Sequence, residues 1–302
     1  MYNDSDPRAS LAGAADARDS GAPIAPPEFF DLRASAPETG GTPEERTFVV
    51  RGQNVVLVHT FAHGGDELDN GAPGGEVAVL TTDDAASYEV VRADGTATTV
   101  DAPGLTVVPP GASRLRVLMD GPIVRLFEST EGEWAERAVN ADSYTRPHPR
   151  VAALTRWPEP AGEERVRVYP LSAVAEQPGR FGRIFRTRAF MVNFLPALDG
   201  PRDPRKLSPH DHADFEQLSL ATEGEFVHHI RTPWLPDRTT WREDDHVHLG
   251  SPSLAVIPPP TVHTSEAHAG GRHLLVDIFS PPRTDFSQKP GWVLNADDYP
   301  MP

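Results

Sequence analysis

The chain has 302 residues, no cysteine and a formal net charge of −16 at pH 7. The missing thiols exclude disulfides, thiolate metal ligands and a cysteine nucleophile, and the negative charge argues against nucleic acid or an anionic membrane as partner. No apolar run approaches the length of a membrane span and no secretory signal is visible, so we expect a cytoplasmic protein.

Turn-forming residues are abundant along the chain: 32 prolines and 24 glycines separate short runs of Val, Ile, Leu and Thr. This composition predicts an all-β fold. Residues 1–28 are rich in Ala, Asp, Ser, Gly and Pro without periodicity, which predicts a flexible leader. The first strands are expected near residues 47–51 and 54–59.

An internal repeat follows. Residues 105–114 align without gaps on residues 254–263, and this alignment puts Arg114 where the second copy has His263. The repeat predicts two copies of one β-unit. Three further pairs of segments match in character: 55–61 with 190–195, 75–80 with 215–220, and 124–129 with 276–281.

Proline-rich sequence connects the two copies. Residues 141–179 read as a linker, with an edge strand expected at residues 166–171. Residues 288–300 are expected to form a tail that packs on one of the copies.

The main candidate site consists of His210, His212, Glu216 and His263, which offer three imidazoles and one carboxylate to one divalent transition metal. On a strand, residues two apart share a face and lie about 7 Å apart, so His210 and His212 are expected to face one interior. Glu216 keeps the same parity, whereas Gln217 is out of phase and is given no role. His263 follows an apolar run and is expected on a neighbouring strand.

The spacing His-x-His-x-x-x-Glu, followed by Gly224 and then by Gly250, Pro258 and His263, resembles the two metal-binding motifs of the cupin superfamily. Gly224 comes one position later than is usual in the family. Pro260 stands where the family usually has glycine.

The resemblance implies an all-β bicupin, with two jelly-roll type barrels in tandem. It divides the chain into a degenerate N-terminal cupin domain over residues 29–140, the linker, and a metal-binding C-terminal cupin domain over residues 180–302 that includes the tail. One divalent metal per chain is expected, in the second domain. Because cupins commonly pair through sheet edges, the resemblance also implies a homodimer.

Other histidines are candidates for supporting roles. His228 and His229 lie on opposite faces of the strand after Gly224, and one of them is expected to point into the pocket as an acid or base. The alternative is that both are solvated. His246 and His248 form a second His-x-His, but the corresponding strand of the family carries no ligands, so we expect them at the surface.

The resemblance to the cupins implies three alternative functions for such a site. The leading hypothesis is an Fe(II) dioxygenase that binds dioxygen and a small enol, phenol or diketone, although Mn(II), Ni(II), Co(II) and Zn(II) accept the same ligands. The first alternative is a redox-neutral isomerase or lyase for a sugar acid or small organic acid, with His229 or His228 as the base. The second alternative is a non-enzymatic bicupin that binds a small molecule.

Overall fold

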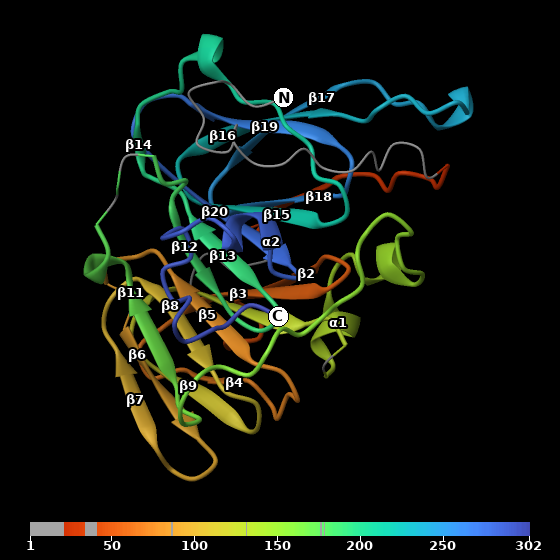
Figure 1. Cartoon of the computed structure of the whole chain (residues 1–302). Helices are drawn as coiled ribbons and strands as arrows, with labels where there is room; N and C mark the ends of the chain where they lie inside the picture. Colours follow the sequence, from red (N-terminus) through yellow and green to blue (C-terminus); the bar gives the residue numbers. More distant parts are fainter. Residues whose placement is uncertain (1–20, 34–40, 86, 131, 176, 178) are drawn as a thin grey trace.

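The computed structural model describes residues 21–33, 41–85, 87–130, 132–175, 177 and 179–302. Strands make up most of its regular structure, so the predicted all-β class is confirmed (Figure 1). Most of the predicted leader lies outside the described residues, and residues 21–27 are irregular. The helical segments are single turns: α1 (Trp134–Arg137), α2 (Thr284–Ser287), η3 (Ala141–Tyr144), η4 (Leu171–Ala173), η5 (Pro204–Lys206) and η6 (Arg238–Thr240).

The N-terminal domain contains a large and a small antiparallel sheet, in the orders β11-β8-β5-β10-β3-β2 and β4-β9-β6-β7. The large sheet is formed by β2 (Thr47–Arg51), β3 (Val55–Ala62), β5 (Val77–Thr81), β8 (Gly104–Val108), β10 (Gly121–Glu128) and β11 (Arg167–Pro170). The small sheet is formed by β4 (Glu67–Asp69), β6 (Ser87–Arg92), β7 (Ala97–Val100) and β9 (Ser113–Met119).

The C-terminal domain repeats this arrangement with the orders β1-β18-β15-β20-β13-β12, to which β14 adds beside β20, and β17-β16-β19. The large sheet is formed by β1 (Glu28–Asp31), β12 (Arg183–Arg186), β13 (Met191–Phe194), β14 (Leu198–Asp199), β15 (Glu216–Glu223), β18 (Ser253–Ile257) and β20 (Arg272–Ser280). The small sheet is formed by β16 (Glu225–Arg231), β17 (Asp245–Gly250) and β19 (Val262–His268).

The strand orders confirm the internal repeat. In the two large sheets β8 corresponds to β18, β5 to β15, β10 to β20 and β3 to β13, which are the four segment pairs that match in sequence. The outermost strands are exchanged between the domains. The predicted edge strand in the linker, β11, pairs with β8 of the N-terminal domain, whereas β1 pairs with β18 of the C-terminal domain. The predicted boundary at residue 29 therefore assigns β1 to the first domain, although its strand partner belongs to the second.

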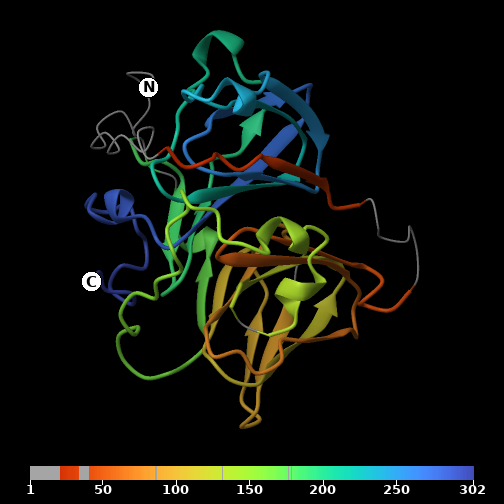
Figure 2. The ribbon, with the colours of Figure 1, turned by 90° about the vertical axis from the view of Figure 1, so that its right-hand side faces the viewer.

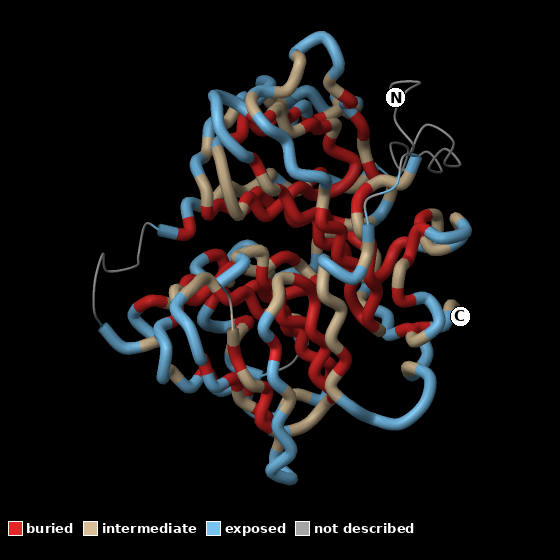
Figure 3. The backbone as a smooth tube through the Cα atoms, turned by 90° about the vertical axis from the view of Figure 1, so that its left-hand side faces the viewer, coloured by how far each residue is buried: buried red, intermediate tan, exposed pale blue. Residues whose placement is uncertain are grey.

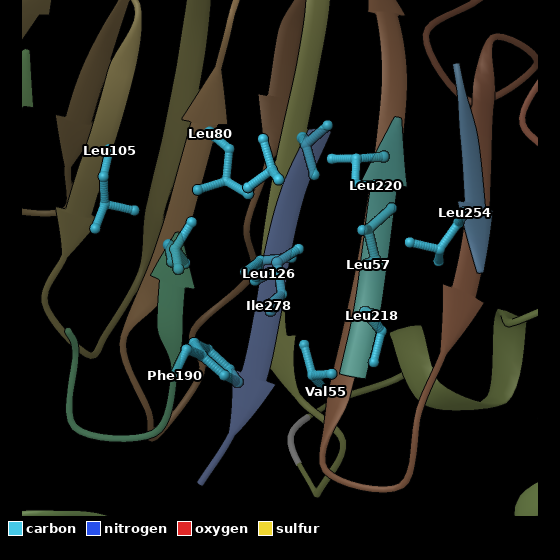
Figure 4. Close-up of a cluster of buried hydrophobic side chains, with 14 of the residues drawn as sticks. Val55, Leu57, Leu80, Leu105, Leu126, Phe190, Leu218, Leu220, Leu254 and Ile278 are labelled. Carbon is cyan, nitrogen blue, oxygen red and sulfur yellow. The ribbon is translucent and has the colours of Figure 1, made fainter. Parts of the chain in front are cut away.

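The two large sheets pack face to face, and the largest apolar core fills the space between them (Figures 1 and 2). Figure 4 shows Leu57 and Leu126 of the N-terminal sheet in one apolar cluster with Leu218, Leu220 and Ile278 of the C-terminal sheet. Alternate residues such as Val56 point the other way, into a separate core inside the N-terminal barrel. Strands that are buried on both faces explain the continuous apolar runs in the sequence.

The C-terminal tail stabilises the junction of the domains. Phe286 and Trp292 pack against Met191 of the C-terminal sheet, and the Tyr299 hydroxyl donates to the buried Glu76 carboxylate at 2.9 Å. Figure 3 shows buried backbone crossing from one domain to the other, with exposed segments at both outer ends. The C-terminal segment thus packs on the C-terminal sheet and reaches the N-terminal domain through Tyr299.

Candidate metal centre

Three histidines meet inside the C-terminal barrel. One ring nitrogen of each of His210, His212 and His263 lies within 4.8 Å of the others, and all three side chains are buried. A backbone bridge aligns two of them, because the His210 N–H donates to the His263 carbonyl at 3.0 Å and the His263 N–H donates to the His210 carbonyl at 2.8 Å. The structure thus brings together three of the four predicted ligands.

Backbone carbonyls orient two of these rings. Nδ1 of His210 lies 2.9 Å from the Ser208 carbonyl oxygen, and Nδ1 of His263 lies 3.0 Å from the Thr261 carbonyl oxygen. A carbonyl oxygen only accepts, so each Nδ1 carries the proton and each Nε2 carries the lone pair. Metal-binding histidines are commonly fixed in this way, and the donor set fits one divalent transition metal. It does not single out Fe(II).

Gln217, which sequence analysis left without a role, lies beside the triad. Its Oε1 is 2.8 Å from Nε2 of His212, and its amide nitrogen donates to Ser219 Oγ at 2.8 Å and to Asp277 Oδ1 at 3.1 Å. Ser219 also donates to Asp277 at 2.8 Å. The amide therefore presents its oxygen to the site, where it can hold His212 in place or serve as a fourth, neutral ligand.

The structure does not bring Glu216 to the histidines, so its predicted place in the ligand set is corrected. A bend at residues 213–214 interrupts the continued strand on which the parity argument relied. Glu216 consequently faces the domain interface, where its carboxylate accepts from the Gln53 backbone N–H at 2.6 Å and from the Tyr144 hydroxyl at 3.2 Å. It also lies 3.5 Å from His148 Nδ1 and raises the pKa of that imidazole.

One signal in the sequence points to Gln217 rather than Glu216. Gly224 comes one residue too late for a ligand at 216, and the usual interval fits a ligand at 217. The position requires glycine, because φ is +85° and an added Cβ would lie 2.7 Å from the Arg272 carbonyl oxygen. The position of Gly224 therefore indicates that residue 217, and not residue 216, occupies the ligand position of the motif.

The triad opens into a cavity of about 360 Å³ whose lining includes His210, His263, Gln217 and Asp277. Its other lining residues are apolar (Phe181, Gly182, Leu195, Pro196, Leu198, Leu275), basic (Arg180, Arg202, Lys206) or hydroxyl-bearing (Ser208, Thr264, Ser265). A cavity of this size, with polar groups at its base and cations along its wall, suits a small anionic ligand.

His228 and His229 lie on opposite faces of β16. His228 is buried inside the barrel, with Nδ1 2.9 Å from the hydroxyl of Ser265, a residue that lines the cavity. Burial lowers the pKa of His228 to about 4, so the ring is neutral at pH 7. His228 thus reaches the cavity through Ser265.

His229 points to the outer face of the small sheet, so its predicted catalytic role is corrected. Its Nε2 lies 2.9 Å from Glu266 Oε2, and its Nδ1 lies 2.7 Å from Nδ1 of His246. The alternation of side chains along a strand accounts for the difference, because Phe226 and His228 take the inward positions. His246 and His248 lie on the exposed strand β17, as expected.

Comparisons with known proteins support the fold. No family model matches the chain, and no curated protein matches its sequence. Solved structures do match: an oxalate decarboxylase with a TM-score of 0.51 at 11% identity, covering 86% of this chain and 79% of the other. The Bacillus subtilis oxalate decarboxylase at pH 4.6 has a TM-score of 0.50 at 11% identity, covering 86% and 78%.

A variant of the Bacillus subtilis enzyme also has a TM-score of 0.50, at 12% identity, covering 92% of this chain and 79% of the other. The chain therefore has the bicupin fold, and the resemblance drawn from the histidine spacing is confirmed at that level. These three solved structures are oxalate decarboxylases. Among the described residues, no helix is long and apolar enough to cross a membrane.

Proposed function

We propose that the protein is a redox-neutral, metal-dependent lyase that acts on a small organic acid in the C-terminal cavity. The observation that carries the proposal is the histidine triad at the base of a cavity whose wall bears three basic side chains. The oxalate decarboxylases of similar fold act on a small dicarboxylate, which supports this class of substrate. The Fe(II) dioxygenase that the sequence favoured gains no comparable support.

The basic side chains are held where an anion would enter. Arg202 donates to the carbonyl oxygens of Ser265 at 3.1 Å and Lys206 at 3.2 Å, and Arg180 donates to the Gly182 carbonyl oxygen at 2.9 Å. These bonds fix both guanidinium groups at the cavity wall. Their positive charge raises the local concentration of a carboxylate substrate against the negative charge of the whole chain.

His210, His212 and His263 would hold the metal, with Gln217 orienting His212 or serving as a fourth ligand. When bound, a divalent metal acts as a Lewis acid that polarises a substrate carboxylate or carbonyl. A neutral glutamine in place of a carboxylate leaves more positive charge in the site, which favours binding of an anionic group. Asp277 keeps the Gln217 oxygen directed inward.

A lyase that releases CO₂ leaves the electron pair of the broken C–C bond on the remaining fragment, which then takes up a proton. We infer that Ser265 and His228 carry this proton, because Ser265 lines the cavity and hydrogen-bonds to His228. The neutral His228 ring donates at one nitrogen and accepts at the other, so it can hold or relay a proton of the Ser265 hydroxyl without gaining a net charge. Asp277 is a second acid or base that lines the cavity.

The test is turnover of a panel of small acids by metal-loaded protein, with product and dioxygen measured together. The panel contains oxalate, malonate, oxaloacetate and a sugar acid, and the proposal predicts cleavage of at least one of them without net consumption of dioxygen. One dioxygen consumed per product would overturn the lyase reading and restore the dioxygenase. Binding without turnover of any acid would favour a non-enzymatic bicupin.

A matched pair of variants tests the role of the cavity wall. Lys206→Gln removes a cation that lines the cavity and is expected to raise KM by about twofold to fivefold. The neighbouring Arg205→Gln removes an exposed cation that pairs with Asp203 outside the cavity, and KM should not change. Equal effects of the two variants would contradict local recognition of an anion.

A further inference from the structure

The strand register shows which residues of the N-terminal barrel occupy the metal-centre positions. Asn70 and Ser113 are joined by a backbone hydrogen bond of 3.0 Å, as His210 is joined to His263. Arg114, which the gap-free sequence alignment puts in place of His263, instead lies on the outer face and pairs with Glu67 at 3.3 Å. The equivalent of His263 is therefore Ser113.

The position of Asp277 is taken by Arg125. Arg125 lies opposite Val79 of β5 and Val58 of β3, just as Asp277 lies opposite Ser219 of β15 and Asn193 of β13. Val58 and Val79 belong to the apolar core of the N-terminal barrel. The first barrel thus has an arginine among valines where the second has a polar network.

Arg125 is a buried cation whose hydrogen-bonding capacity is only partly used. Its side chain is 2% exposed, and Nη1 donates to the Asp69 carbonyl oxygen at 2.7 Å and to Asn70 Oδ1 at 3.2 Å. Nε is buried and finds no acceptor among the described residues. Burial lowers the pKa of Arg125 to about 10, so the group remains charged at neutral pH. A buried charge normally has a partner of opposite sign.

Arg125 lines a cavity of about 360 Å³. Aromatic rings form one wall: the Trp134 ring lies 5.1 Å from the Arg125 guanidinium and 4.3 Å from that of Arg137, and the Phe127 ring lies 5.8 Å from Arg125. Carboxylates lie around the same cavity, among them Glu44 and Asp69, both exposed. A simple anion would be repelled by these carboxylates, whereas a zwitterion would satisfy both them and Arg125.

We propose that the N-terminal barrel binds a small aminocarboxylate, with its carboxylate on Arg125 and its ammonium group toward Glu44 and Asp69. The guanidinium fork suits a carboxylate, and the ring of Trp134 offers an apolar surface to a side chain. This site is separate from the metal centre, so the proposal does not depend on the lyase activity. The N-terminal barrel would then bind its ligand through a buried arginine, whereas the C-terminal barrel would use a metal.

The experiment is calorimetric titration with L-phenylalanine, 3-phenylpropanoate and 2-phenylethylamine, the last two of which lack the amine and the carboxylate respectively. L-Phenylalanine is expected to bind with a Kd of about 1 mM or tighter, and each truncated probe at least about tenfold more weakly. Titrations in His263→Ala protein should give the same Kd, which excludes chelation of a metal by the amino acid. No binding of L-phenylalanine up to about 20 mM would overturn the proposal.

Variants locate the site. Arg125→Gln should abolish binding and Arg125→Lys, which keeps the charge but loses the fork, should weaken it at least about tenfold. Arg114→Gln is the matched control on the outer face and should bind normally. If Arg125→Gln does not fold, fluorescence provides the second test: L-phenylalanine should quench wild-type protein and not a Trp134→Phe variant. Unchanged affinity in Arg125→Lys, or equal quenching in Trp134→Phe, would contradict the site.

Discussion

The two barrels share one strand order but differ in what their interiors contain. Val77 and Val79 line the N-terminal interior, whereas Gln217 and Ser219 occupy the equivalent positions of the C-terminal one. On the opposite face of the same strands, Leu80 and Leu220 both join the shared core between the domains. The sheet face between the domains preserves the fold, and the inner face is where chemistry can change.

This difference follows from the two-residue period of a strand. Substitutions at alternate positions change one face and leave the other intact, so a barrel can lose its ligands without losing its packing. Among the described residues, no group comparable to the histidine triad lies in the N-terminal barrel. The comparison predicts that chemistry and stability respond to different residues of the same strands.

The largest expected effect is on the metal. His210→Ala removes a buried ligand and should weaken metal binding at least about a hundredfold, measured by competition with a chromophoric chelator. His268→Ala, an exposed histidine of β19, is the control and should bind metal normally. Similar losses in the two variants would show that the triad is not the site.

Acid pH should destabilise both domains, because each buries a neutral histidine. Burial lowers the pKa of His59 and of His228 to about 4. Between pH 6.5 and 4 these two histidines therefore bind protons in the unfolded chain but not in the folded chain. Stability should therefore fall as the pH drops from about 6.5 to about 4, by up to about 3 kcal/mol for each histidine. Urea denaturation of metal-free protein between pH 7.5 and 4.5 measures the loss.

His59→Leu sharpens this prediction, since it removes a titrating group beside Leu80 and Leu220. The variant should show a shallower decline in stability with acid than the wild type. An identical decline in the variant and the wild type would refute the assignment.

The third-largest effect distinguishes the contribution of Gln217 to metal binding from that of its sequence neighbour Glu216. Gln217→Ala should weaken metal binding by about tenfold to a hundredfold, because the oxygen beside His212 is lost. Glu216→Gln should leave metal affinity unchanged, since that side chain faces Gln53 and Tyr144. If Glu216→Gln weakened binding and Gln217→Ala did not, the register derived from Gly224 would be wrong.

The smallest effect concerns the domain junction. Glu216→Gln should lower the free energy of unfolding by about 1 kcal/mol. Because Glu216 raises the pKa of His148, the wild-type pair is fully stabilising below pH 6.5 and loses strength as the pH rises through the raised pKa. The deficit of the variant should be larger at pH 6 than at pH 9 in urea denaturation. A deficit independent of pH would contradict the pairing.

The repeated apolar runs predicted two copies of one β-unit. The resemblance of the His-x-His motif and the later histidine to the cupin superfamily then supplied the barrel form and the triad. The outward orientation of the Glu216 side chain could not be predicted. A bend at residues 213–214 reverses which alternate residues of the following strand face the barrel interior. The inward position of Gln217 is the other consequence of that bend.

Contacts between residues far apart in the sequence were harder to predict. Asp277 acquires its place from pairing between β20 and β15, and a single sequence does not reveal that register. Arg125 is surrounded in sequence by Val124 and Leu126, a pattern that indicates a strand but not which face holds the charge. The equivalence of Ser113 and His263 likewise depends on strand pairing rather than on gap-free alignment.

The most direct test of the account is the metal content of purified protein, measured by elemental analysis after loading with Mn(II), Fe(II), Co(II), Ni(II) or Zn(II) and removal of excess. We expect close to one equivalent per chain for at least one of these metals, lost in His263→Ala and kept in Arg125→Lys. Two equivalents would contradict the difference between the barrels. No bound metal under any loading condition would contradict the metal centre itself.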